Sequence, residues 1–555
     1  MTSTSVLEPL QASTVPPPPA IPVGRTIDAA TLRRWLQDGS EIALLDVREH
    51  GQYGEGHPFL AVHLPYSRLE LEAGRLVPRL ATRIVVFDDG PPSDVAPRAA
   101  TRLRALGYTG VHLLQGGAPA WSGTGAALFK GVNLPSKTFG EQIEHAFGVP
   151  HIGAAELKAR LDAGEPLVLL DGRTLEEHRK MTIPGAVPVP NGELALRWRS
   201  VVPDASTPVV VHCAGRTRSI IGAQILRDLG LPNPVLALEN GTQGWALAGY
   251  PLERGSTRVP PPAAPGDLLR QSRADAASAA AREGLAPLTV QAAQAWIDDP
   301  QRSTFVLDVR TADEFAAGTL PGAVHAPGGQ LLQAADLTIG VRGSRVLLLD
   351  DDGTRAPVIA LWLQRLGFEA AAVQGGIAAP LRIAAPAALP LAPLPELGAE
   401  QLAGLRNPDN TPAPYYVADL RGSLAYRRQH SRGAAWSIRP QLPRDVARGT
   451  GGDQRHAVLL LADEEAVARL AAQDLREAGW QRVSWAPAAA ARAAGWPQES
   501  TPHLPADADA IDYLFFVHDR HDGNLDAARR YLEWETGLLA QCTADELGTF
   551  RLPRH

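Results

Sequence analysis

A short apolar segment that ends in Asp-x-Arg occurs four times along the chain, and this repeat strongly limits the fold. Its aspartates lie 125, 137 and 111 residues apart, and each spacing is the length of a small domain. The full length of 555 residues accommodates three to five domains of ~100–200 residues. We therefore expect several small cores in series. The four aspartates are Asp46, Asp171, Asp308 and Asp419.

Each copy is followed by the same order of elements. A β-prone run leads into a small loop, and an amphipathic helix that ends near a glycine follows it. The runs cover residues 84–87, 209–212, 346–349 and 458–461. Short apolar strands that alternate with helices predict an α/β fold class, with a small parallel sheet in each domain and helices on both of its faces.

Composition divides the chain further, since Pro/Ala-rich stretches separate the repeats and read as spacers. We expect a disordered arm and a helical tail at the two ends of the chain, with four domains between them. The predicted ranges are 1–24 (arm), 25–135, 136–256, 257–283 (linker), 284–384, 385–407 (linker), 408–500 and 501–555 (tail).

The tail carries apolar residues at helical spacing from near Asn524 onward. Such a stripe predicts a helix that packs on another domain or on a second subunit. A homodimer through this helix is therefore one of our expectations.

Charge and cysteine content exclude several classes of protein. The net charge is −7 without long blocks of one sign, so we expect no nucleic-acid or membrane partner. Two cysteines rule out a disulfide framework and cysteine-based metal clusters. No secretory signal or membrane-spanning stretch is recognisable, and we predict a cytoplasmic protein.

One loop differs from its counterparts. The second repeat reads His-Cys-Ala-Gly-Arg-Thr-Arg-Ser from residue 212 and contains Cys213, whereas the other three loops have acidic residues and no thiol. A loop between a parallel strand and a helix lies at the carboxyl edge of the sheet, where backbone N–H groups and the helix dipole favour anions. Cys213 should therefore have a lowered pKa, with Arg216 and Arg218 adding positive charge beside it.

The spacing Cys213-x-x-x-x-Arg218 and the flanking Asp171-Gly172-Arg173 resemble the rhodanese superfamily of sulfurtransferases, as four tandem rhodanese-like three-layer α/β/α domains of which one is competent. The related phosphatases use Cys-x5-Arg, and the sixth residue after Cys213 is Ser219. The resemblance therefore disfavours phosphatase or arsenate-reductase chemistry.

The resemblance implies a thiosulfate sulfurtransferase without cofactor or metal. Cys213 is the expected nucleophile and carries a persulfide, which passes to a thiol, to cyanide or to a protein acceptor. Ala214, Gly215, Thr217 and Ser219 are expected to cradle the persulfide, while Arg216, Arg218 and Arg197 bind the donor. Asp171 and Arg173 brace the site. The loop differs from those of the well-known thiosulfate and mercaptopyruvate enzymes, so the donor rests on the two arginines, which favour an anion such as thiosulfate.

Several alternatives stay open. The chain could be a persulfide carrier or sensor that acts by binding partner proteins, or four purely structural modules. Arg197 could be an ordinary surface arginine. The cluster from His518 to Asp522 could bind a metal, although a solvated loop is the preferred interpretation. Cys542 could accept sulfur from Cys213, although a partly buried unpaired thiol explains it as well.

Overall fold

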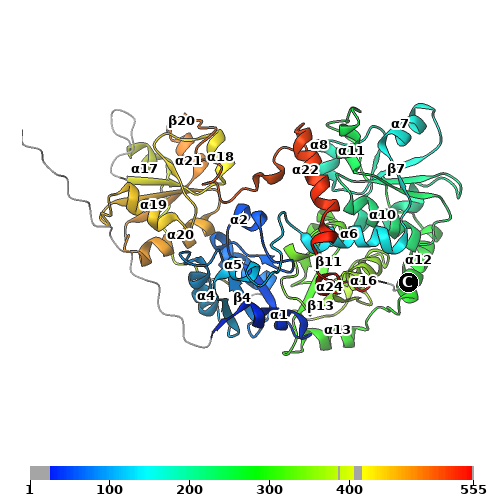
Figure 1. Cartoon of the computed structure of the whole chain (residues 1–555), viewed down its shortest axis with the longest axis horizontal. Coiled ribbons are helices and arrows are strands. Elements are labelled where there is room, and N and C mark those ends of the chain that lie inside the picture. The colour runs from blue at the N-terminus through cyan, green and yellow to red at the C-terminus, as the bar shows by residue number, and fades with distance from the viewer. Residues whose placement is uncertain (1–24, 386–387, 406–414, 553–555) are drawn as a thin grey trace, which may run out of the picture.

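Four small parallel sheets follow one another along the chain in the computed structural model, which describes residues 25–385, 388–405 and 415–552 (Figure 1). The predicted arm at residues 1–24 lies outside the described residues. We call each sheet with its helices a unit, first to fourth in chain order. The expected α/β class with small parallel sheets is confirmed.

The first two units each have a five-stranded sheet with equivalent strand order. In the first unit the order is β1 (Thr26–Ile27), β5 (Val111–Leu114), β4 (Ile84–Phe87), β2 (Ala43–Asp46) and β3 (Val62–His63), with helices α1 (Ala29–Gln37), α2 (His50–Glu55), α3 (Leu69–Leu76), α4 (Val95–Ala105) and α5 (Gly117–Ser122). In the second unit the order is β6 (His151–Ile152), β10 (Val235–Leu238), β9 (Val209–His212), β7 (Val168–Asp171) and β8 (Val187–Pro188), with α6 (Leu134–Phe147), α7 (Ala154–Asp162), α8 (Leu175–Lys180), α9 (Leu194–Arg197), α10 (Thr217–Asp228) and α11 (Gly241–Leu247).

The third and fourth units have four-stranded sheets. The third contains β12 (Val324–His325), β11 (Thr304–Asp308), β13 (Arg345–Leu349) and β14 (Glu369–Ala372), with α13 (Val290–Ile297), α14 (Ala312–Ala317), α15 (Gly328–Gln333) and α16 (Arg355–Arg365). The fourth contains β17 (Ala435–Trp436), β15 (Tyr415–Asp419), β18 (Ala457–Ala462) and β19 (Val483–Pro487), with α18 (Ser423–Arg428), α19 (Leu442–Gly449), α20 (Glu465–Glu477) and α21 (Ala488–Ala493). A short antiparallel pair joins β16 (His430–Ser431) to β20 (Gln498–Glu499).

The repeated Asp-x-Arg forms the same brace in all four units, and in the first three its arginine is buried. In the second unit Arg173 Nη2 lies 2.7 Å from Asp171 Oδ2 and also donates to the Met181 carbonyl at 2.5 Å. The arginine of each other unit binds its own aspartate and the carbonyl eight residues further along in the same way. The repeat therefore ties the end of a central strand to the segment that follows it, and Asp171 and Arg173 belong to this brace.

Two predicted linkers contain packed structure. The range 257–283 includes α12 (Asp267–Arg282), which packs on α16 and buries Ala276 and Ala279. The range 385–407 includes α17 (Ala399–Gly404), and the N–H of Leu397 donates to the Trp485 carbonyl in the fourth unit at 2.9 Å. Proline and alanine content therefore overstated the length of both linkers, because alanine also forms close-packed helix faces.

The tail segment, residues 501–552, crosses from the fourth unit to the second, where α22 (Leu525–Thr536) lies beside α6 and α11 (Figure 1). The Asn524 side chain caps this helix by accepting from the N–H of Ala527 at 3.0 Å. The shorter α23 (Leu538–Gln541) and α24 (Ala544–Leu547) follow. The apolar side of α22 contacts its own chain, and a homodimer through it stays a prediction. No helix among the described residues is long and apolar enough to cross a bilayer.

Candidate functional site

Cys213 lies in the loop between β9 and α10, which comprises residues 213–216 and is called the Cys213 loop below. Its side chain is only 2% exposed. Two N–H groups at the start of α11 hold the loop, because Thr242 donates to the Cys213 carbonyl at 2.8 Å and Gln243 donates to the Ala214 carbonyl at 3.1 Å. Gly241 adopts a left-handed φ of +51°, and a Cβ there would lie 2.2 Å from the Cys213 carbonyl oxygen. The position therefore requires glycine.

The backbone of the Cys213 loop has N–H groups that no described residue engages. Within the described part of the chain, the N–H groups of Ala214, Gly215 and Arg216 have no acceptor. We call these three groups the cradle. The N–H of Ser219, which the sequence assigned to the cradle, instead donates to the Arg216 carbonyl at 3.0 Å. Free N–H groups that converge at the start of a helix stabilise negative charge.

The corresponding loops of the first and third units contain an aspartate at the position of Cys213. Asp88 accepts from the N–H of Gly90 at 2.8 Å and from the N–H of Ala96 at 2.9 Å. Asp350 accepts from the N–H of Ala356 at 3.0 Å. A side-chain anion of the protein thus occupies this position in both units, which indicates that the backbone here favours an anion.

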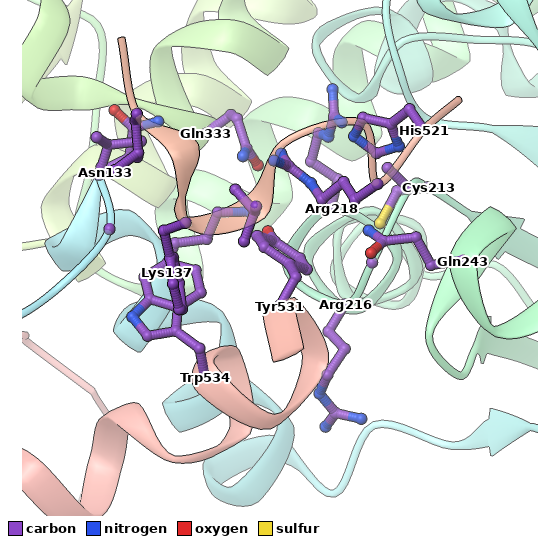
Figure 2. A pocket seen from close by; sticks show the side chains of 18 of the residues that line it. Asn133, Lys137, Cys213, Arg216, Arg218, Gln243, Gln333, His521, Tyr531 and Trp534 are labelled. Atoms are coloured by element: carbon purple, nitrogen blue, oxygen red, sulfur yellow. The ribbon is translucent and has the colours of Figure 1, made fainter. Parts of the chain in front are cut away.

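Arg218 stays close to Cys213 but carries its own counter-charge. Its guanidinium forms two bonds to Glu177 of α8, at 2.6 and 2.7 Å. Burial works to lower the pKa of Arg218, but Glu177 and then Cys213 outweigh it and raise that pKa above its usual value. Figure 2 shows Arg218 beside the Cys213 sulfur. Arg218 therefore supplies a permanent positive charge next to the thiol.

Arg216 points away from the thiol (Figure 2). Its guanidinium binds Glu141 of α6 at 2.9 and 3.0 Å and also pairs with Glu144. The structure therefore does not bring the two arginines together on one ligand, and Arg216 fastens the loop to α6.

Arg197 lies outside the cavity that Cys213 lines. It binds Glu193 at 2.7 Å and the Pro261 carbonyl at 2.5 Å. The hydroxyl of Thr217 also faces away from the sulfur and donates to Glu535 of the tail segment at 2.6 Å.

Cys213 opens into a cavity of about 330 Å³ whose walls come from four parts of the chain. The second unit contributes the Cys213 loop, Glu177 and Gln243. The first unit contributes His50 and the segment just before α6, Lys137 of α6 lines the cavity from the second unit, and the third unit contributes Gln333 of α15. The tail segment closes the remaining side with Tyr513, Phe516, Arg520, His521, Tyr531 and Trp534. Figure 2 shows Tyr531, Trp534 and His521 around the labelled residues of the second unit.

The tail segment packs directly on the Cys213 loop. Glu535 is fully buried and pairs with Lys137 of α6 at 3.2 Å, in addition to its bond with Thr217. A Cβ on Gly215 would lie 2.8 Å from Glu535 Oε2 and 2.9 Å from the Tyr531 ring, so this loop position has room only for glycine. The tail is thus part of the site.

The cluster from His518 to Asp522 differs from the expected solvated loop, because Arg520 and His521 line the cavity. Burial, together with the positive charge of Arg520, lowers the pKa of His521 to about 3, so the imidazole is neutral at pH 7. Within the described ranges there is no group of three or more His, Cys, Asp or Glu side chains that could hold a metal ion.

Sequence reasoning missed Gln243, Arg520, Tyr531 and Trp534. The polar Gly turn at residues 239–241, which recurs in three units, was the available signal for Gln243, since it places the start of α11 against the Cys213 loop. For the tail, the signal was the pair of aromatic residues three positions apart on one helix face. Cys542 is partly buried and does not line the cavity, and burial raises its pKa to about 12.

Comparisons with known proteins agree with this geometry. The family model for the Rhodanese-like domain matches residues 28–124, 153–248 and 289–380, which cover the first three units. A crystal structure of a thiosulfate sulfurtransferase from Pseudomonas aeruginosa is 38% identical, covers 95% of this chain and 100% of that chain, and gives a TM-score of 0.85.

Two curated relatives match shorter stretches. The HTH-type transcriptional regulator Rv0324 of Mycobacterium tuberculosis is 36% identical over 107 residues, which are 19% of this chain and 45% of the relative. YrkF of Bacillus subtilis, named as a candidate sulfur carrier protein, is 31% identical over 102 residues, which are 18% of this chain and 54% of the relative. The chain thus spans about half the length of these two relatives. The three domain matches and the similarity along nearly the whole chain place this protein in the rhodanese-like family.

Proposed function

We propose that this protein is a sulfurtransferase that moves sulfane sulfur from thiosulfate, or a related anionic donor, to a thiophilic acceptor through a persulfide on Cys213. One observation carries the proposal: a buried thiol takes the place of the internal carboxylate that fills the loop in two sister units, and the cradle beside it is unfilled. The similarity to a thiosulfate sulfurtransferase along 95% of the chain supports it.

The chemistry has two steps. The Cys213 thiolate attacks the outer sulfur of thiosulfate, the sulfur–sulfur bond of the donor breaks, and sulfite leaves with the bonding electron pair. The enzyme then carries a Cys213 persulfide anion. In the second step the acceptor thiolate attacks the terminal sulfur of the enzyme persulfide. The sulfur–sulfur bond on Cys213 breaks, the acceptor leaves as a persulfide, and the Cys213 thiolate is restored.

The cradle, Arg218 and Arg216 have different roles in this chemistry. The cradle N–H groups donate hydrogen bonds to the persulfide anion and so stabilise its charge. Arg218 adds a positive charge that Glu177 holds in place. Arg216 does not contact the donor in this proposal; it holds the Cys213 loop in position, because its guanidinium pairs with Glu141 and Glu144 of α6.

A turnover assay with thiosulfate and cyanide tests the proposal. We expect sulfite and thiocyanate to form in equal amounts with the wild-type protein. The variant Cys213→Ser should form neither, while Cys542→Ser provides the matched thiol control. Equal activity in wild type and Cys213→Ser would overturn the proposal.

A carrier or sensor that hands sulfur to a partner protein is the second candidate, and the resemblance to YrkF over 102 residues favours it. The burial of Cys213 argues against it, because a protein acceptor could reach a side chain that is 2% exposed only after the tail segment moved. Multiple turnovers with small thiols alone would favour the enzyme, because a carrier requires a partner protein to accept the sulfur.

A further inference from the structure

The cations that line the Cys213 cavity differ in whether the protein itself neutralises them. Lys137, Arg216 and Arg218 each have a carboxylate partner, namely Glu535, Glu141 and Glu177. Arg520 of the tail segment has none within 4.0 Å among the described residues, and its Nε is buried without a hydrogen-bond partner. Its guanidinium lies 4.5 Å from the centre of the Tyr531 ring, and this stacking holds it in place.

A second polar group in the cavity also lacks a partner. Gln243 is 3% exposed, and neither its side-chain nitrogen nor its side-chain oxygen has a hydrogen-bond partner in the described chain. Figure 2 shows this amide beside the Cys213 sulfur. Buried polar groups without partners are costly, so a side chain of this kind in a cavity indicates a ligand that satisfies it.

The size and walls of the cavity favour an organic ligand over an inorganic ion alone. The volume of about 330 Å³ is in the range of sites for small organic molecules, whereas thiosulfate is a compact ion that would fill a fraction of it. Phe516, Tyr531 and Trp534 give the tail side an aromatic wall. Such a wall binds the carbon skeleton of a ligand.

We propose that Arg520 binds the anionic end of the sulfur acceptor, which is a small organic thiol with a carboxylate or sulfonate group. This inference rests on the proposed function, because it assigns the acceptor of the Cys213 persulfide. The thiolate of the acceptor attacks the terminal sulfur, the persulfide bond of the enzyme breaks, and the acceptor leaves as an organic persulfide. Throughout the transfer Arg520 pairs with the anionic group, and Tyr531 orients the guanidinium.

Three thiols of equal length test this charge preference: 2-mercaptoethanesulfonate, 2-mercaptoethanol and cysteamine carry a negative, neutral and positive group, respectively, on the same two-carbon thiol. The protein is first loaded with thiosulfate and freed of excess donor. The rate at which each thiol removes the sulfur from Cys213 is then followed by intact mass. We expect the anionic thiol to react fastest at equal thiolate concentration.

The variant Arg520→Gln should lower the preference for the anionic thiol over the neutral one by about tenfold or more, while loading by thiosulfate is unchanged. Arg530→Gln is the matched control, because Arg530 is exposed on the nearby α22 and does not line the cavity. Equal rates for all three thiols, or a preference that Arg520→Gln leaves intact, would overturn the inference. A loading defect in Arg520→Gln with unchanged thiol preference would also overturn it, because Arg520 would then bind the donor. Failure of the wild-type protein to load would instead refute the proposed function.

Discussion

The second and third units build nearly the same loop and use it differently. In each unit a threonine lies where the helix after the loop begins. The arginine that follows this threonine binds a glutamate of another helix, the one that follows the Asp-x-Arg brace. In the second unit the loop begins with a thiol, and no described residue accepts from its cradle N–H groups. In the third unit the loop begins with a carboxylate, which accepts from the N–H of Ala356 in the following helix. The matching residues are Cys213 and Asp350, Thr217 and Thr354, Arg218 and Arg355, and Glu177 and Glu314.

The third loop also joins units. Arg355 binds Asp352 at 2.6 Å within its own loop and reaches Glu193 of the second unit at 2.9 Å. The same framework therefore holds two units together when acidic residues fill the loop, and places a thiol beside the cradle when Cys213 begins it. Under the proposed function, this difference explains how the second unit can be active while the third serves as support.

Exchanging the first residue of the two loops has the largest expected effect. Cys213→Asp should abolish sulfur transfer completely, because the nucleophile is lost and the new carboxylate can accept from a loop N–H as Asp88 does in the first unit. The reciprocal Asp350→Cys, made in the Cys213→Ser background, should not restore persulfide formation, because Asp351 and Asp352 remain beside the new thiol. If peptide mass mapping found persulfide on residue 350 at the wild-type rate, the presence of a thiol would be the only difference that matters for persulfide formation in the two loops.

The residue before each loop gives a pH-dependent difference in stability. Burial lowers the pKa of His212 from 6.5 to about 4, and the third unit has Leu349 at this position. The unfolded chain therefore binds a proton more readily than the folded one, and stability is lost as the pH falls from 6.5 towards 4. The loss is up to about 3 kcal/mol.

Urea unfolding at a series of pH values checks this expectation. His212→Leu installs the residue of the third unit and should remove this part of the acid destabilisation. The difference in free energy of unfolding between wild type and variant should therefore become smaller as the pH falls from 6.5 towards 4. A difference that stays constant over the same pH range would contradict the assignment.

The paired glutamates give a smaller effect on catalysis. Glu177→Gln should lower kcat/KM for thiosulfate by about tenfold, because Arg218 loses the charge that fixes its position beside the thiol. Glu314→Gln makes the same change at Arg355 and should leave kcat/KM unaltered. Equal losses in the two variants would mean that the pair acts through stability alone, which thermal unfolding of both proteins would reveal.

The smallest effect is expected at the second thiol. Cys542 lies outside the cavity, and burial raises its pKa to about 12, so it is protonated at neutral pH. Cys542→Ser should therefore transfer sulfur at the wild-type rate. A marked loss of turnover with normal loading of Cys213 would instead place Cys542 in the transfer route.

Much of the fold could be read from the sequence because it depends on local pattern. The Asp-x-Arg repeats, the β-prone runs and the loop with Cys213 are contiguous segments, and they predicted the small parallel sheets and the position of the thiol loop. The orientation of Arg216 and Arg218 could not be read in this way, because Glu141 and Glu177 approach them from other elements.

The cavity itself depends on contacts between distant parts of the chain. Arg520 and Tyr531 lie some three hundred residues from Cys213 in sequence, and only the path of the tail across the units brings them to the second unit. An apolar helical stripe indicates that a helix packs, but it does not identify the surface that the helix covers.

The most direct test of the account is the mass of the protein after incubation with thiosulfate and removal of excess donor. We expect a gain of one sulfur atom per chain, located on the peptide that contains Cys213, released by a thiol and absent in both Cys213→Ser and Cys213→Asp. A protein that gains no sulfur, or gains it equally after Cys213 has been replaced, would contradict the central claim that the unfilled cradle of the second unit is the site of sulfur transfer.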